Sequence, residues 1–313
     1  MSSIDANLQA VRGRISDARQ GDSHGVTLVA VSKSQPPEAI RAAFEAGCRD
    51  FGESYVQEAV AKIAALEELP ITWHFIGHLQ GNKARDVAER FDWVHAVDRA
   101  KIAATLARSR PAGRPPLNIC IQVNISHEAT KGGVRADEAA ALASEVAGLP
   151  GLALRGLMGM ASPTGDVSRQ RAEFASLRRV FEDLVARGHS LDTLSMGMSQ
   201  DFEAAIAEGA TMVRVGTAVF GERKPKPGTD PDFAKQPGNR LVVFDDQDSL
   251  RHGQTSLVFD HALRTRPVGS VTSTSVPDPT MLRTSIRPPW LSTMRLAIGR
   301  PRPLPLDVTL PPR

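Results

Sequence analysis

The chain has few of the residues that stabilise secreted, metal-bound or membrane proteins. Cys48 and Cys120 are its only cysteines among 313 residues, and they form no paired motif, which argues against disulfides and a cysteine metal cluster. No apolar run approaches the roughly 20 residues needed to cross a bilayer. Residues 1–20 also lack the apolar core of a signal peptide. These absences predict a soluble, cytoplasmic protein with no membrane partner.

An excess of positive charge is also missing from most of the chain. The formal net charge is +3, but basic residues outnumber acidic ones only in residues 225–313, and the preceding part is slightly acidic. Nucleic acid is therefore not expected as a partner of the folded part. Binding of nucleic acid or an anionic surface by the basic tail is a separate and weaker hypothesis.

Residues 225–313 differ in composition from the rest of the chain. They hold 14 of the 22 prolines and no glutamate. Because proline removes backbone donors and blocks helices, such a segment does not readily bury a core. We therefore predict a folded domain over residues 1–224 and a mostly disordered, low-order tail over residues 225–313. A shifted reading frame would also produce such a segment.

Before the tail, predicted strands and helices alternate strictly. An amphipathic helix in residues 2–20 comes first, and the expected strands are 27–32, 50–53, 72–76, 93–97, 119–125, 153–158, 193–196 and 212–215. Asp98 is expected to cap the helix after the fourth strand. The pattern predicts the α/β class and a single (β/α)₈ TIM barrel. An open doubly wound sheet is the alternative, although no Gly-x-Gly-x-x-Gly follows the first strand.

Lys33 closes the first apolar run, Val29 to Ser32. Active sites of such barrels form at the carboxyl ends of the strands, so the Lys33 side chain is expected at the barrel mouth. Desolvation there favours the neutral amine, which is the form that attacks an aldehyde. By position alone, a surface lysine that begins a loop is the favoured interpretation, and the glycine–hydroxyl turns after the last two strands are needed to shift the balance.

The last two strands each end in a glycine followed by a hydroxyl residue. Gly197 and Ser199 follow the seventh strand, and Gly216 and Thr217 follow the eighth. Barrel enzymes frequently bind phosphate between these two loops, where glycine permits close backbone approach. The pattern favours a phosphate site, with ordinary tight turns as the alternative.

Arg214 lies within the apolar eighth strand and is expected to point into the barrel. Its guanidinium stays protonated and can only donate hydrogen bonds, so it would keep a pyridine nitrogen unprotonated. The alternative is an arginine paired with a carboxylate in the barrel wall. His74 and His78 are too few, and wrongly spaced for a strand, to indicate a metal site.

Several sequence blocks, in order, carry a resemblance to a known family. The blocks cover residues 30–33, 51–58, 73–83, 122–124, 156–158, 194–199 and 213–217, and they include the strand ends described above. On these blocks the chain resembles the pyridoxal phosphate homeostasis protein family over roughly residues 4–222. One departure is Ser54, which stands where the family usually has Asn.

The resemblance implies a fold-type III barrel, like the N-terminal domain of alanine racemase, that binds pyridoxal 5′-phosphate (PLP). It implies that Lys33 forms the Schiff base, that Arg214 faces the pyridine nitrogen, and that the phosphate is held by Ser199, Gly216 and Thr217. Ser54 and Met198, in the matching blocks, are counted as further cofactor-binding residues.

The resemblance also implies a carrier or regulator of the PLP pool that supplies PLP-dependent apoenzymes without efficient catalysis. The runner-up is a fold-type III racemase or decarboxylase of amino acids. Racemisation in that fold needs a second acid/base, usually a tyrosine, and Tyr55 is the single tyrosine here. A phosphate-binding barrel without aldehyde chemistry is a third hypothesis.

Overall fold

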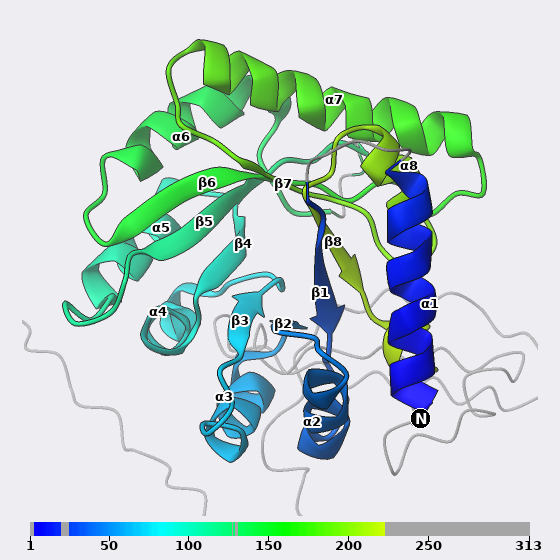
Figure 1. Cartoon of the computed structure of the whole chain (residues 1–313). Coiled ribbons are helices and arrows are strands. Elements are labelled where there is room, and N and C mark those ends of the chain that lie inside the picture. Colours follow the sequence, from blue (N-terminus) through cyan, green and yellow to red (C-terminus); the bar gives the residue numbers. More distant parts are fainter. Residues whose placement is uncertain (1–2, 20–24, 127, 129–130, 223–313) are drawn as a thin grey trace, which may run out of the picture. The chain divides into compact units, whose positions relative to one another are not determined.

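The computed structural model describes residues 3–19, 25–126, 128 and 131–222. Within them, eight parallel strands close into a barrel in chain order, with β8 paired to β1 (Figure 1). The strands are β1 (Thr27–Val31), β2 (Asp50–Glu53), β3 (Thr72–Phe75), β4 (Trp93–Val97), β5 (Leu117–Gln122), β6 (Leu152–Met158), β7 (Thr193–Ser195) and β8 (Met212–Val215). The predicted single barrel is confirmed, and the open doubly wound sheet is wrong.

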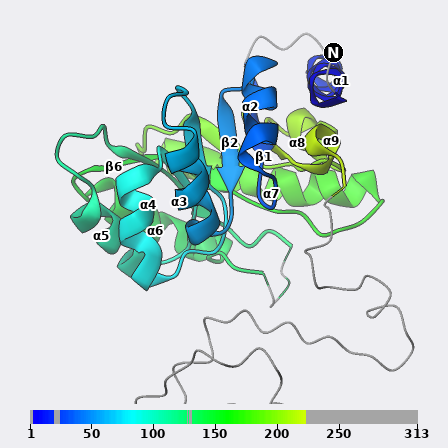
Figure 2. The ribbon, with the colours of Figure 1, turned by 90° about the horizontal axis from the view of Figure 1, so that it is seen from below.

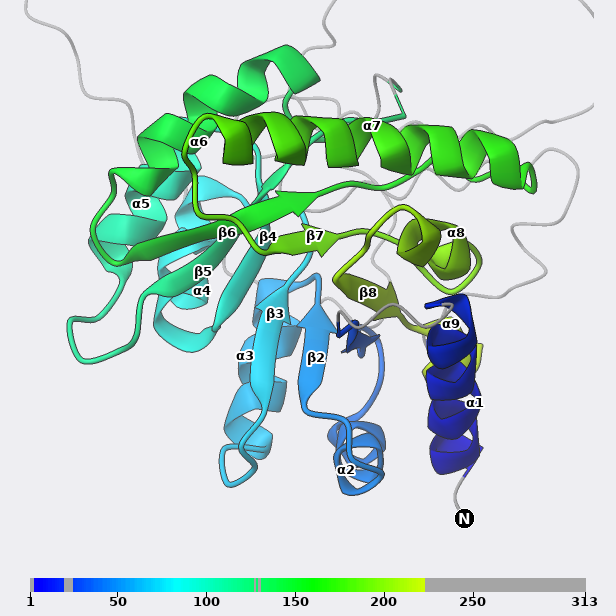
Figure 3. The same ribbon diagram turned by 45° about the horizontal axis from the view of Figure 1, so that its top comes forward.

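The helices lie outside the strands, as Figures 2 and 3 show. They are α1 (Ser3–Ala18), α2 (Pro37–Glu45), α3 (Val56–Ala65), α4 (Ala84–Arg90), α5 (Ala100–Ser109), α6 (Ala139–Ala147), α7 (Val167–Ala186), α8 (Phe202–Ala207) and α9 (Thr217–Phe220), with short 3₁₀ turns at Gly81–Lys83 and Ala136–Glu138. The first helix, α1, packs against α2, α8 and α9, beside the seam where β8 meets β1.

The expected cap at Asp98 is wrong. The residue that precedes α5 is Arg99, which makes no side-chain capping bond. Asp98 stands one residue too early, and its carboxylate instead accepts from the Arg99 guanidinium at 2.6 Å.

Alternation along the strands separates two layers of side chains. In β5, Leu117, Ile119 and Ile121 belong to the main apolar core, which also contains the buried faces of the helices. Cys120 points the other way, into a small interior cluster with Ala96 and Met158. Most apolar burial, the dominant favourable term in folding, therefore lies between barrel and helices.

The barrel interior also contains polar side chains. His74, His95 and Ser195 are fully buried, and Arg214 is 4% exposed. Because buried polar groups are costly without hydrogen-bond partners, this interior must be internally satisfied. Among the described residues, no helix is long and apolar enough to cross a membrane. The predicted tail, residues 225–313, lies outside the described residues.

Candidate functional site

A cavity of about 500 Å³ opens at the carboxyl ends of the strands. We call it the mouth cavity. All seven residues predicted to bind the cofactor line it: Lys33, Ser54, Met198, Ser199, Arg214, Gly216 and Thr217. They come from the ends of β1, β2, β7 and β8, so strands far apart in the sequence supply one site. Its volume is in the range typical of small-molecule pockets.

Lys33 lies in the turn that follows β1, and its side chain is half-buried. A buried ionic cluster lies under this turn. The ammonium of Lys62, on α3, donates to the Ser32 carbonyl at 2.7 Å and to Glu53 at 2.8 Å. The Ser32 hydroxyl donates to the same Glu53 oxygen at 2.6 Å. The residue before Lys33 is thus held through both its backbone and its side chain.

The residue after Lys33 is held by the same helix. Ser34 adopts a left-handed backbone conformation, with φ of 63°. Its N–H donates to Glu58, which also accepts from Lys62. Such a conformation is costly for a non-glycine residue and persists only where neighbours enforce it. The turn that presents Lys33 is therefore fixed on both sides by α3.

Burial in this cluster raises the pKa of Glu53, and the adjacent Lys62 opposes that shift. One Glu53 oxygen, Oε2, is buried with no hydrogen-bond partner. A partly satisfied buried ion pair contributes little net stability but is costly to break. The cluster therefore matters more for holding the geometry of the turn than for the stability of the fold.

The turn between β7 and α8 approaches the helix closely. Gly197 has φ of +90°, and a Cβ added there would lie 2.8 Å from the Phe202 Cα and 2.7 Å from the Ala205 Cβ. The carboxylate of Asp201 accepts from the Met198 N–H. Burial raises the pKa of Asp201, while that backbone bond lowers it. The turn places Met198 and Ser199 at the cavity with their backbone fixed.

The turn after β8 forms the adjacent wall. A Cβ on Gly216 would lie 3.3 Å from the Val31 carbonyl oxygen, so glycine lets β8 end close beside β1. Thr217 begins α9 and lines the same cavity. The two glycine–hydroxyl turns predicted from the sequence therefore meet at one rim.

Arg214 points into the barrel, as predicted. It donates to the Ser195 hydroxyl at 2.8 Å and to the Gly159 carbonyl at 3.1 Å. Neither acceptor is a carboxylate, so the part of the chain that the structure describes gives no support to the alternative of a wall arginine paired with an acid. Burial lowers the pKa of Arg214 to about 10, which still leaves it protonated at neutral pH.

Part of the wall was missed from the sequence. The loop after β6 contributes Met160, Ala161, Ser162, Pro163 and Thr164, and Gln170 of α7 joins it. The available signal was the position of this loop after a predicted strand, together with its hydroxyl residues. Tyr55, by contrast, is 53% exposed and is not among the residues that line the cavity.

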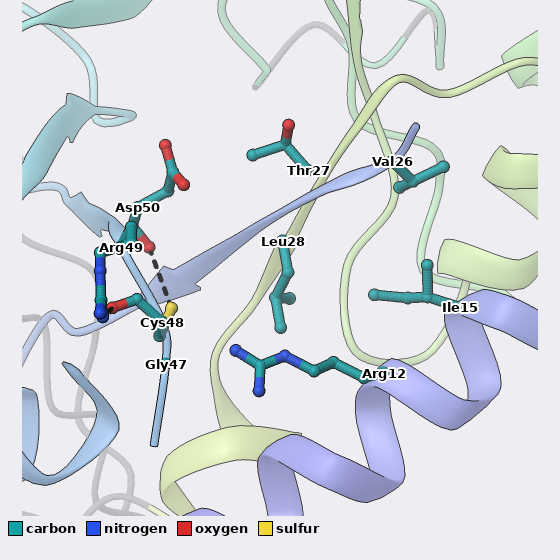
Figure 4. Close-up of a pocket in the computed structure, with 9 residues that line it drawn as sticks. All are labelled: Arg12, Ile15, Val26, Thr27, Leu28, Gly47, Cys48, Arg49 and Asp50. Atoms are coloured by element: carbon teal, nitrogen blue, oxygen red, sulfur yellow. Dashed lines mark hydrogen bonds between the residues drawn. The ribbon is translucent and has the colours of Figure 1, made fainter. Parts of the chain in front are cut away.

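A smaller cavity of about 320 Å³ lies at the amino ends of the strands (Figure 4). Its lining includes Arg12 of α1, Leu28 of β1, and Cys48, Arg49 and Asp50 around the start of β2. It offers no lysine, so it lacks the amine expected of the site. Of these two cavities among the described residues, the mouth cavity is the one that combines an amine, a buried guanidinium and hydroxyl side chains.

Known proteins resemble the chain over this barrel. Residues 3–224 match the family described as alanine racemase, N-terminal domain. A pyridoxal phosphate homeostasis protein of Pseudomonas aeruginosa is 54% identical over 226 residues, covering 71% of this chain and 97% of the relative. The Escherichia coli K12 protein of the same name is 52% identical over 229 residues, covering 71% and 98%.

Solved structures are similar to the chain over the same part. PipY of Synechococcus elongatus PCC7942, solved with PLP bound, is 39% identical with a TM-score of 0.62, covering 70% of this chain and all of that chain. Alanine racemase from Corynebacterium glutamicum, 16% identical with a TM-score of 0.55, shares the fold over 72% of this chain and 62% of its own length. This chain belongs to the pyridoxal phosphate homeostasis protein family.

Proposed function

We propose that the protein binds pyridoxal 5′-phosphate in the mouth cavity, attached through Lys33, and serves PLP homeostasis by holding and supplying the cofactor without efficient catalysis. The observation that carries this proposal is the meeting of an amine, a guanidinium and two glycine–hydroxyl turns in one cavity. Binding of PLP is reported for the related PipY structure.

The residues present fit the cofactor. PLP supplies an aldehyde that condenses with a neutral primary amine, and a pyridine ring that draws electron density from the attached group. Lys33 provides the amine, and Arg214 a donor for the ring nitrogen. Ser199, Gly216 and Thr217 would hold the phosphate, with Ser54 and Met198 beside the bound molecule.

Each group has a supporting reason in the chain. The buried ionic cluster around Lys62 fixes the turn around Lys33. Little conformational entropy is therefore lost in this turn when a ligand is attached. Arg214 stays a donor, because it remains protonated at neutral pH. A ring nitrogen that faces a donor is kept unprotonated, which weakens the ring as an electron sink and favours storage over turnover.

The racemase or decarboxylase alternative has less support. An exposed Tyr55 outside the cavity lining is poorly placed to act opposite Lys33. Asp201, which lines the cavity, is engaged with the Met198 N–H. We propose PLP-dependent apoenzymes as recipients and the cytoplasm as the location, where the two free thiols, Cys48 and Cys120, would stay reduced.

Borohydride reduction tests the proposal directly. Protein incubated with PLP is reduced, digested and analysed by mass spectrometry, and we expect the pyridoxyl label on Lys33. Lys33→Ala should abolish the visible absorbance of the bound cofactor while keeping the circular dichroism of the barrel. Lys101→Ala, which changes an exposed lysine of α5, serves as the control. A label on another lysine would overturn the assignment.

Catalysis is tested separately. The PLP-loaded protein is incubated with single amino-acid enantiomers, and we expect no conversion at ordinary enzyme rates of about 1–10³ s⁻¹. Racemisation or loss of carbon dioxide at such rates would show that the protein is a racemase or decarboxylase and not a carrier.

A further inference from the structure

A chain of hydrogen bonds crosses the barrel interior from the amino ends of the strands to Arg214. It begins at Asp50, whose Oδ1 lies 3.0 Å from His74 Nε2. His74 Nδ1 lies 3.0 Å from His95 Nε2, and His95 Nδ1 lies 2.8 Å from Ser195 Oγ. Arg214 Nη1 donates to the same oxygen at 2.8 Å. Asp50 lines the smaller cavity (Figure 4), whereas Arg214 lines the mouth cavity.

The chemistry of the two ends gives the chain one direction. A carboxylate only accepts, so His74 carries its proton on Nε2 and donates to Asp50. With a neutral ring, His74 Nδ1 then accepts from His95 Nε2. His95 Nδ1 accepts in turn from the Ser195 hydroxyl, whose oxygen accepts from the Arg214 guanidinium. Every donor then has an acceptor, with both histidines neutral.

The surroundings keep this arrangement from relaxing. His74, His95 and Ser195 have no exposed surface, so water does not reach their polar atoms from outside. The indole of Trp93 stacks on the His74 ring, with centroids 5.6 Å apart. Burial first, and then the proximity of His74 and of the Arg214 guanidinium, lowers the pKa of His95 well below its usual value. A rigid, neutral connection thus separates the charges of Arg214 and Asp50.

The chain has a consequence for the mouth cavity. A guanidinium carries five N–H donors. Arg214 uses two of them inside the barrel, for hydrogen bonds to Ser195 and to the Gly159 carbonyl. These two bonds fix the plane of the group, and the orientation of Ser195 Oγ depends in turn on His95. Removal of Ser195 would take away one acceptor of Arg214. Removal of His95 would free the orientation of the Ser195 hydroxyl, and in both cases the guanidinium could rotate more freely.

We propose that Ser195, His95, His74 and Asp50 are positioning residues that fix the orientation of Arg214 toward the bound cofactor. This inference rests on the proposed function only for the identity of that ligand. The hydrogen bonds of the buried chain join protein groups only, so they are tested first without added cofactor.

The first experiment measures the tautomers. Full-length protein labelled with ¹⁵N in histidine is studied by NMR without cofactor, and His74→Asn and His95→Asn assign the two sets of signals. We expect the His95 ring to stay neutral from about pH 6 to 8, and each neutral ring to carry its proton on Nε2. A proton on Nδ1 of either neutral ring, or a charged His95 in this range, would overturn the direction of the chain.

The second experiment measures the effect on PLP. Ser195→Ala removes one acceptor of Arg214 and the donor to His95, and we expect about tenfold weaker PLP binding, the equivalent of one hydrogen bond. The absorbance maximum of the lysine-bound cofactor should shift, because it reports the environment of the ring nitrogen. Ser144→Ala, whose hydroxyl bonds only within α6, should change neither property.

The outcomes separate the two proposals. An unchanged spectrum and affinity in Ser195→Ala, with wild-type binding intact, would overturn the positioning role. A wild-type protein that takes up no PLP on Lys33 would overturn the proposed function, while the tautomer measurement would still decide whether the buried chain exists.

Discussion

Two residues of the mouth cavity are held in different ways. Arg214 is buried and bonded inside the barrel, so its position is set before any ligand arrives. Ser199 is half-buried on the turn in which Gly197 lies close against α8. Affinity for an anionic ligand is therefore expected to depend on single hydroxyl contacts added to a rigid frame.

Ser199→Ala is expected to weaken PLP binding by about 1–3 kcal/mol, the range for loss of one hydrogen bond to a charged group. Equilibrium dialysis of PLP against the variant and the wild type gives the difference. Ser176→Ala is the matched control, since that hydroxyl donates to the Glu173 carbonyl within α7. Equal affinity in Ser199→Ala would place the phosphate elsewhere in the cavity.

The lowered pKa of His95 predicts that the folded protein loses stability in acid. Its folded-state pKa is lowered well below 6.5, by burial first and then by His74 and Arg214. Below pH 6.5 the unfolded chain therefore binds a proton at this residue, whereas the folded chain does not. The contribution of neutral His95 is complete above pH 6.5 and declines as the pH falls toward the folded-state pKa, by up to about 1.4 kcal/mol per pH unit.

Urea unfolding of the wild type and His95→Asn between about pH 5 and 8 measures this effect. The difference in unfolding free energy between the two proteins should shrink as the pH falls. Comparison with the variant matters because the raised pKa values of Glu53 and Asp201 act in the opposite sense in both proteins. A difference that is constant with pH would show that His95 titrates normally in the fold.

Among the elements, the strand ends decide the site and the helices hold it. The turn after β1 is anchored by α3, through Lys62 and Glu58. The turn after β7 is closed by the contact of Gly197 with α8. These two polar turns are therefore kept in place by α3 and α8, which are not among the elements that line the cavity.

Gly197→Ala and Gly188→Ala separate backbone strain from close packing. Both glycines have positive φ, +90° and +94°, but a Cβ at position 188 meets nothing within 4 Å. Gly188→Ala should therefore cost only about 1–2 kcal/mol, the penalty of a left-handed conformation for alanine. Gly197→Ala adds an overlap with Phe202 and should cost at least about 1–3 kcal/mol more.

Urea unfolding gives both free energies, and PLP titration shows the effect on the site. Equal destabilisation by the two substitutions would mean that the turn after β7 yields easily. In that case the fixed geometry of Met198 and Ser199 would lose its support.

For the whole molecule, one barrel carries the family resemblance. The matched segment spans residues 3–224, and the curated relatives align over 71% of this chain but 97% or 98% of their own length. The described residues that line the mouth cavity, among them Lys33, Ser199 and Arg214, lie within this segment. Fold and PLP binding should therefore both belong to this part of the chain.

A chain shortened to residues 1–224 should unfold cooperatively at the midpoint of the barrel transition of the full chain, and bind PLP with equal affinity. Thermal unfolding followed by circular dichroism and PLP titration provide the comparison. A large loss of stability or affinity would show that residues 225–313 contribute to the domain, against the predicted division.

The sequence by itself determined the order of the elements. Apolar alternation and runs predicted all eight strands to within a few residues at each end, because side-chain burial on a strand repeats every second residue. The positions of Lys33, Gly197 and Gly216 directly after such strands were enough to place them at the barrel mouth. The precise start of α5 was not predicted, since Asp98 had a stronger partner in the neighbouring Arg99 than in the helix amides.

Only the tertiary structure decided which polar residues meet. His74, His95 and Ser195 each stand in an ordinary strand of the sequence, and nothing local distinguishes them from satisfied surface groups. Barrel closure brings residues about 20 to 100 positions apart within hydrogen-bond distance and removes water from them. The loop after β6 joins the cavity for the same reason, because loop conformation follows from long-range packing that a linear pattern does not encode.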